Sequence, residues 1–242
     1  VYEPFKNFRF FFRFDIHFST DCDAFCTFQR NTWTPFGTLN ECLVQGVHCE
    51  SRNDALVKVR TFGNPDDDMD CDPTDVDEFD EEDDVYSYDV KSFYIYTSPM
   101  CRQIPSGIAD FFRNLTVLVV AETGLRTVSK DDLKPFSQLK GLYLDKNNLE
   151  MLEEDLLIHN KKLQEINFSK NKLRFIGYTI LDPLKRLKKV EFYGNPCINI
   201  GAETFHQLED LKSLLKAQFE PTLTARFVAN SEESMECIKT IE

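Results

Sequence analysis

The sequence has no long apolar run, few basic residues and no nucleotide-binding motif. Its uncharged apolar stretches, such as 115–121, are far shorter than the roughly 20 residues of a membrane-spanning helix. Its 28 lysines and arginines stand against 41 aspartates and glutamates, and the net charge of -13 disfavours binding to a phosphate backbone. Neither GxGxxG nor GxxxxGK occurs. We therefore expect a soluble protein with no membrane span and no nucleic-acid partner.

Residues for catalysis or metal binding are also scarce. The four histidines occur singly, at positions 17, 48, 159 and 206, whereas a nucleophile needs a base within hydrogen-bond reach. Cys22 and Cys26 are four residues apart but lack the second matching pair that is typical of structural zinc sites. The sequence therefore predicts no enzyme activity, no cofactor and no metal.

Eight cysteines form an even set that gathers towards the two ends of the chain. Their number and placement favour disulfides over zinc, and therefore an oxidising compartment. They are Cys22, Cys26, Cys42, Cys49, Cys71, Cys101, Cys197 and Cys237. We expect a secreted, extracellular protein.

A 24-residue repeat dominates the second half of the chain. Four segments align without a gap and fit LxxLxLxxNxL; they start at Leu115, Leu139, Leu163 and Leu187. A looser copy starts at Lys91 and places Tyr94 and Tyr96 in the two strand-core columns. Other columns of the alignment are apolar too, with Asn160 as the exception. Because one such repeat cannot bury its apolar columns alone, the copies must stack into a curved solenoid with one short parallel strand per turn.

This pattern resembles extracellular leucine-rich repeats over residues 91–220. The residues that carry the resemblance are Leu139, Leu142, Leu144, Asn147 and Leu149, with their 24-residue copies. The resemblance implies an α/β fold, a short solenoid of about five repeats with cysteine-rich caps at both ends. It also implies that Asn147, Asn171 and Asn195 bind the backbone of adjacent turns inside the coil. Thr123 and Pro99 replace this asparagine in the two earlier repeats.

The same resemblance divides the chain into five parts. Residues 1–21 form a Phe-rich extension, 22–65 an N-terminal cysteine cap, 66–90 an acidic loop, 91–200 the repeats and 201–242 a C-terminal cap. The string NPC that ends at Cys197 resembles the start of a C-terminal cysteine cap, for which Cys237 is the natural partner. Apolar residues at three- and four-residue steps predict a helix over 203–218.

The N-terminal cap leaves its disulfide pairing open. Cys22, Cys26, Cys42 and Cys49 allow three connectivities, and Cys71 is the nearest candidate partner for Cys101. The string CTFQRNTW, residues 26–33, followed by Cys42, resembles the N-terminal module of secreted leucine-rich repeat proteins of insects. Many of those proteins act in haemolymph defence or extracellular recognition, so this resemblance implies a role in innate immunity without naming a ligand.

Two segments lie outside the repeat pattern. Between 8 and 14, phenylalanines occupy every second position and Arg9, Phe11 and Arg13 the positions between, which predicts a strand that either packs on the molecule or associates with another copy. The segment 66–89 holds 14 acidic residues and no basic one, and is either a solvated loop or an arm that attracts a basic partner. A calcium loop fits poorly there, because Pro73 and Phe79 stand where its glycine and glutamate belong. Tyr86 and Tyr88 are candidates for sulfation.

The x positions of each LxLx strand predict the residues of the concave face. The expected ligand-binding set is Phe93, Ile95, Val117, Val119, Tyr143, Asp145, Glu165 and Tyr193. Its apolar members either form an exposed binding patch or are covered by the N-terminal extension or the acidic loop. Two glycosylation sequons begin at Asn114 and Asn167, the second on this same face.

The sequence thus predicts a secreted leucine-rich repeat protein that binds a protein or other extracellular ligand through its concave face. The alternative is a structural, self-assembling extracellular protein. In that reading, the Phe-rich terminus and one end of the solenoid supply contacts in a homo-oligomer.

Overall fold

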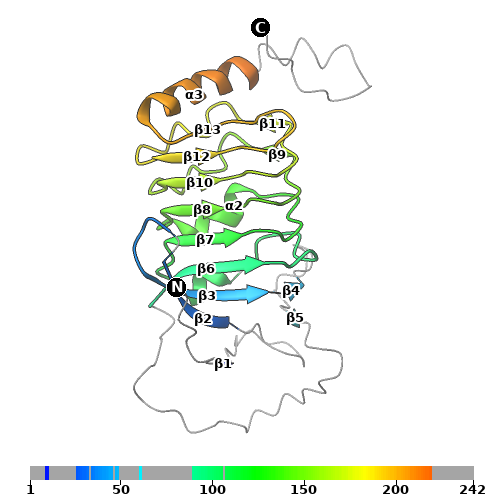
Figure 1. Cartoon of the computed structure of the whole chain (residues 1–242), viewed down its shortest axis with the longest axis vertical. Helices are drawn as coiled ribbons and strands as arrows, with labels where there is room; N and C mark the ends of the chain where they lie inside the picture. The colour runs from blue at the N-terminus through cyan, green and yellow to red at the C-terminus, as the bar shows by residue number, and fades with distance from the viewer. Residues whose placement is uncertain are drawn as a thin grey trace.

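The computed structural model describes residues 9–10, 26–32, 34–45, 47–48, 60–61, 89–105 and 107–219. In these residues the chain winds into stacked turns along a nine-stranded sheet, as Figure 1 shows. In spatial order its strands are β1 (Arg9–Phe10), β2 (Cys26–Asn31), β3 (Leu39–Gln45), β6 (Val90–Tyr96), β7 (Val117–Val120), β8 (Gly141–Tyr143), β10 (Glu165–Asn167), β12 (Lys189–Glu191) and β13 (Gly201–Ala202). The predicted leucine-rich repeat solenoid is confirmed.

The sheet is parallel in its centre and antiparallel at its ends. Strands β3, β6, β7, β8, β10 and β12 pair in parallel, whereas β1, β2 and β13 add antiparallel edges. Two small pairs lie apart from it: β4 (Val47–His48) with β5 (Arg60–Thr61), and β9 (Met151–Leu152) with β11 (Phe175–Ile176). The return path of two turns contains the short helices α1 (Ile108–Phe111), α2 (Lys130–Leu133) and η1 (Lys134–Phe136).

The motif leucines fill one continuous core between the sheet and the return path. Leu139, Leu142, Leu144 and Leu149 are all fully buried, and their counterparts in the next turn are buried as well, whereas Leu187 in the turn after that is only partly buried. Asn160, the polar exception in an apolar column, is also fully buried. Its Nδ2 donates to the carbonyls of Leu133 and Phe136, at 2.9 and 3.0 Å, so it satisfies backbone groups of the preceding turn.

The motif asparagines join consecutive turns, as the resemblance implied. Asn147 Oδ1 accepts from the N–H groups of Thr123, Gly124 and Leu125 at 3.0–3.1 Å, and its Nδ2 donates to the Val120 carbonyl at 2.6 Å. Asn171 and Asn195 repeat this arrangement one and two turns later. Each side chain thereby satisfies buried backbone groups that the tight turns leave without partners.

Helix α3 (Phe205–Phe219) covers the C-terminal end of the stack, where the sequence predicts a helix over 203–218. Leu208, Leu211 and Leu215 are buried on its inner side. The Phe219 ring meets the Phe175 ring edge-on, with centroids 5.7 Å apart. The helix therefore seals apolar columns that the last turn would otherwise expose.

The register predicted for the first turn is wrong by one residue. Phe93 pairs with Leu118 and Ile95 with Val120, so these two side chains enter the core, with exposed fractions of 7% and 1%. Tyr94 and Tyr96, predicted as core residues, take the outward positions instead.

The physical reason lies in the turn after β6. Thr97 and Glu122 both have a positive φ, 48° and 57°, which identifies them as equivalent positions 25 residues apart. Ser98, not Pro99, therefore takes the asparagine position, and its N–H donates to the Glu122 carbonyl at 3.2 Å. A proline has no N–H to make this bond. The spacing returns to 24 at Arg102, because the Arg126 N–H donates to the Arg102 carbonyl. The extra residue of the first turn therefore lies between Ser98 and Arg102, next to Cys101.

Several predictions lie outside the described residues. These include the acidic loop up to residue 88, the two tyrosines Tyr86 and Tyr88, most of the Phe-rich extension, and the side chains of Cys22, Cys49, Cys71 and Cys237. Of the alternating segment, Arg9–Phe10 forms β1 and pairs with β2. Cys42, Cys101 and Cys197 are disulfide-bonded. The pairings Cys197–Cys237 and Cys71–Cys101 stay predictions.

Candidate functional site

The outward side of strands β6, β7, β8, β10 and β12 is the concave face of the solenoid. Strand pairing aligns its side chains in columns that cross the turns. The first column holds Ser92, Val117, Gly141, Glu165 and Lys189, and the second Tyr94, Val119, Tyr143, Asn167 and Glu191. The third, just beyond the strand ends, holds Tyr96, Ala121, Asp145, Ser169 and Tyr193.

The half of this face over β6 and β7 is covered. Val117, Val119 and Ala121 point outward as predicted, yet they are 0%, 3% and 4% exposed. They form an apolar cluster separate from the main core, with Phe36, Leu39, Tyr94 and Tyr143 packed against it. Of the two alternatives for Val117 and Val119, the structure therefore supports the covered one, whereas the outward orientation predicted for Phe93 and Ile95 is wrong.

The cover comes from the connection between β2 and β3, described at residues 32 and 34–38. In Figure 1 this blue segment runs along the strand ends as far as β7 and β8. A Cβ added to Gly141 would lie 2.9 Å from Phe36 Cε2, so the Phe36 ring rests on the bare backbone of β8. The sequence analysis considered the Phe-rich extension and the acidic loop as covers, but it did not consider this connection.

A buried carboxylate lies beside the covered cluster. Glu41, in β3, pairs in register with Ser92, which is the neighbour of Val117 in the first column. Its exposed fraction is 0%, and Ser92 Oγ donates to its Oε2 at 2.6 Å. The sequence analysis missed this residue, because Glu41 precedes the first repeat and lies outside its pattern.

The half of the face over β8, β10 and β12 is open and polar. We call this surface the open half: Tyr143, Asp145, Glu165, Asn167, Ser169, Lys189, Glu191 and Tyr193. Most of these side chains are half-buried, and Tyr193 is 50% exposed. Three carboxylates stand against one lysine, so the open half is acidic.

Hydrogen bonds and ion pairs fix the side chains of the open half. Tyr143 Oη donates to Glu165 Oε2 at 2.7 Å. Lys189 Nζ lies 2.8 Å from Glu191 Oε1 and 3.0 Å from Glu203 Oε1, so its charge is already matched by two carboxylates. Ser169 is only 8% exposed, and its Oγ has no partner in the described part of the chain. This hydroxyl is therefore a buried polar group beneath the surface of the open half.

The environment shifts the ionisation of three groups in the open half. Burial, followed by the hydrogen bond to Glu165, raises the pKa of Tyr143 well above its usual range, so its hydroxyl stays a donor. Burial also raises the pKa of Asp145. Two hydrogen bonds, to Glu191 first and Glu203 second, raise the pKa of Lys189 and keep it charged.

Two glycines allow aromatic rings to lie against the sheet. A Cβ on Gly141 would approach Tyr143 Cε2 to 2.8 Å, and one on Gly201 would approach Tyr193 Cε2 to 2.6 Å. Tyr143 and Tyr193 therefore lean over bare backbone on either side of Glu165 and Asn167. The result is a polar, acidic surface bordered by two tyrosines.

Other predicted site residues fall elsewhere. Asn114 is exposed before β7, whereas Asn167 is half-buried in the open half, where its Oδ1 accepts from the Ser169 N–H at 2.8 Å. His159 is exposed, and His206, on α3, lies 3.9 Å from Asp210. Among the described residues, no group of three or more His, Cys, Asp or Glu side chains is placed to hold a metal ion. Every helix in this part of the chain is too short or too polar to cross a membrane.

Comparisons with known proteins agree with the repeat assignment. Residues 137–196 match the family model described as leucine rich repeat. No curated protein sequence is significantly similar to this chain.

Solved structures with leucine-rich repeats are similar over part of the chain. A chain of the Drosophila Toll–Spatzle complex is 24% identical, with a TM-score of 0.42, over 46% of this chain and 16% of its own. A chain of the glycosylated form of that complex is also 24% identical, with a TM-score of 0.43, over 46% of this chain and 15% of its own. A leucine-rich repeat protein of Leptospira interrogans is 20% identical, with a TM-score of 0.39, over 45% of this chain and 26% of its own. The matches span about a quarter or less of each of these proteins.

Proposed function

We propose that this chain is a secreted binding protein, not an enzyme, and that it recognises a basic surface on an extracellular protein through the open half. The observation that carries this proposal is the contrast within the concave face. The apolar part is buried under Phe36, whereas the accessible part presents three carboxylates and two tyrosines. Tyrosine-rich, charge-complementary surfaces are typical of protein interfaces.

The open half is also rigid before any partner arrives. Its side chains project from strands that are paired on both sides, and Tyr143, Glu165, Lys189 and Glu191 already hold one another in place. Binding to such a surface orders few side chains, so less entropy is lost on association. A basic partner would meet Asp145, Glu165 and Glu191 in fixed positions.

The proposal also includes secretion of the protein and a role in innate immunity. The disulfides at Cys42, Cys101 and Cys197 support an oxidising compartment. The exposed Asn114, which begins a sequon, is accessible for a glycan. The immune role rests on the resemblance of residues 26–33 to the caps of insect proteins.

The test is affinity capture from extracellular fluid with two matched charge reversals. Glu165→Lys with Glu191→Lys reverses the open half, and Asp131→Lys reverses an exposed acid on α2 as the control. Circular dichroism would establish that both variants are folded. We expect a partner that the wild type and the control retain, that the double variant loses, and whose retention weakens with added salt. Equal capture by the double variant would contradict the proposal.

A second function, self-assembly, is favoured by the position of β1. This strand lies at the end of the nine-stranded sheet, and terminal strands are where further chains add most readily. Sedimentation velocity over a range of concentrations separates the two functions. A sedimentation coefficient that rises with concentration would favour self-assembly, and a constant one would favour a monomeric binding protein.

A further inference from the structure

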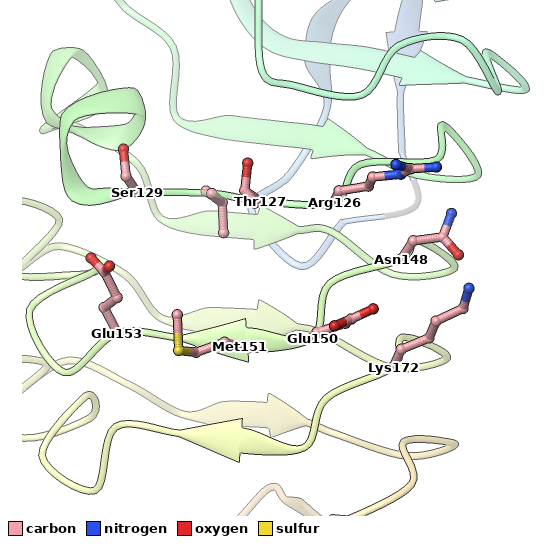
Figure 2. Close-up of a pocket in the computed structure, with 9 residues that line it drawn as sticks. Arg126, Thr127, Ser129, Asn148, Glu150, Met151, Glu153 and Lys172 are labelled. Carbon is pink, nitrogen blue, oxygen red and sulfur yellow. The ribbon is translucent and has the colours of Figure 1, made fainter. Parts of the chain in front are cut away.

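A groove of about 780 Å³ opens between the second and third turns, on a flank of the solenoid away from the concave face. Figure 2 shows its two walls, the segment Arg126–Ser129 above and the segment from Glu150 to Glu153, with β9, below. Asn148 and Lys172 complete the lining at one end. Its volume is within the range of ligand sites in proteins.

The groove exists because a ladder of backbone hydrogen bonds is interrupted there. One turn later, the Phe175 N–H donates to the Glu150 carbonyl and the Gly177 N–H to the Leu152 carbonyl, which joins β11 to β9. The equivalent bonds between the second and third turns would run from Met151 to Arg126 and from Glu153 to Val128. Neither bond is formed within the described residues, and β9 pairs there with β11 alone.

The interruption follows from the return paths of the two turns. The second turn proceeds from residues 126–129 into α2 and η1, with Ser129 and Asp132 forming a capping box, whereas the third turn has no helix at this place. A helix is wider than an extended chain, so the strands in front of it are held apart. Donors on one wall, at Met151 and Glu153, then face acceptors on the other, at Arg126 and Val128.

From this geometry we infer that the groove binds an extended peptide segment, which inserts as a parallel strand between the two turns. Its carbonyls accept from Met151 and Glu153, and its N–H groups donate to the carbonyls of Arg126 and Val128. This is the addition of a strand to a free sheet edge, in which the main chain supplies affinity. Met151, 52% exposed, offers an apolar contact to one side chain of the peptide.

The charges of the groove specify the peptide further. Arg126 and Lys172 lie together at the end where both walls begin, and Glu153 lies at the other end (Figure 2). None of these three makes an ion pair within the described part of the chain. A parallel strand therefore fits best with an acidic residue near its N-terminal end and a basic one near its C-terminal end.

Amide hydrogen exchange of the full chain, followed by NMR, tests this inference with a capped peptide of sequence DTVTVK. In the free protein we expect Met151 and Glu153 to exchange at least about tenfold faster than Phe175 and Gly177, because unpaired amides are open to solvent. Saturation with the peptide should slow both exchanges by about tenfold or more. Equal protection in the free protein, or no slowing with millimolar peptide, would overturn the inference.

Two control peptides distinguish strand addition from nonspecific binding. A DTVTVK peptide methylated on alternate backbone nitrogens should not bind, and its binding with equal affinity would also overturn the inference. The charge-exchanged peptide KTVTVD should bind roughly fivefold more weakly than DTVTVK. The Arg126→Glu, Lys172→Glu variant should reverse that preference.

The groove is distinct from the open half, so the Glu165→Lys, Glu191→Lys variant should bind DTVTVK as the wild type does. Loss of peptide binding in that variant would mean that the peptide binds the concave face, and would contradict the groove as its site.

Discussion

The two halves of the concave face are built on consecutive strands of one parallel sheet, yet one half is covered and the other is open. Over β7 the outward residues are apolar, and Phe36, from the connection between β2 and β3, covers them. Over β8, β10 and β12 they are acidic and aromatic, and they stay accessible. The repeat thus determines the inward columns in both halves alike, whereas a segment outside the repeat decides which outward residues can meet a ligand.

The junction between the two halves depends on one asparagine, Asn147. Of the changes predicted here, its replacement should lower the free energy of unfolding the most. Asn147, in the first turn of the open half, binds three N–H groups of the covered turn. Asn147→Ala leaves these buried donors unsatisfied, so we expect unfolding in urea to require about 3 kcal/mol less free energy. Asn195→Ala, at the far end, removes fewer bonds and should cost about 2 kcal/mol. Equal costs would contradict this account of the junction.

Removal of the cover should affect only one half. Phe36→Ala deletes the ring that lies on Gly141 and against the cluster of Val117 and Val119, and we expect a loss of about 2 kcal/mol in urea unfolding. The control is Tyr193→Ala in the open half, where the ring is 50% exposed and the expected change is within about 0.5 kcal/mol. A cost for Phe36→Ala as small as that of the control would mean that the cover is not packed.

The two glycines under aromatic rings give a matched pair with smaller effects. Gly141→Ala forces a Cβ against both Phe36 and Tyr143, whereas Gly201→Ala meets only the exposed ring of Tyr193, which can swing away. We expect Gly141→Ala to cost about 1 kcal/mol by overpacking. Gly201→Ala should cost less, as measured by thermal unfolding of both variants. The reverse order would place the tightly packed ring in the open half.

The smallest predicted effect is a pH dependence from Asp145. Burial raises the pKa of its carboxyl, so the folded chain holds this proton more tightly than the unfolded chain does. The resulting stability is complete below the ordinary pKa of 3.8 and is lost as the pH rises through the folded-state pKa. Asp145→Asn should therefore be more stable than the wild type at neutral pH, and this gain should disappear in acid. A gain that is independent of pH would contradict the assignment to Asp145.

The periodic parts of the structure could be predicted from the sequence, because burial enforces the pattern. Leu139, Leu142 and Leu144 specify the core of each turn, and the apolar steps over 203–218 predict α3. The prediction was wrong in the first turn, where the repeat pattern is weaker. Pro99 aligns with Asn147 at two spacings of 24, but the positive φ of Thr97 and Glu122 shows that Ser98 takes this position.

The candidate sites were harder to predict, because they depend on contacts between segments far apart in the chain. No local pattern connects Phe36 with Gly141, or Glu41 with Ser92. The flank groove results from a helix in one turn and its absence in the next, which leaves the N–H groups of Met151 and Glu153 without backbone acceptors among the described residues. Such sites arise where the structure departs from the repeat. An alignment of the repeats shows what the copies share and therefore does not reveal these departures.

The most direct test of the two-halves account is the paramagnetic relaxation that a neutral, soluble gadolinium chelate causes in the protein's NMR signals. The account predicts strong relaxation of the Tyr193 ring protons and little for the methyl groups of Val117 and Val119. Equal relaxation of these valine methyls and the Tyr193 ring would show that the face is open along its whole length, and would contradict the account.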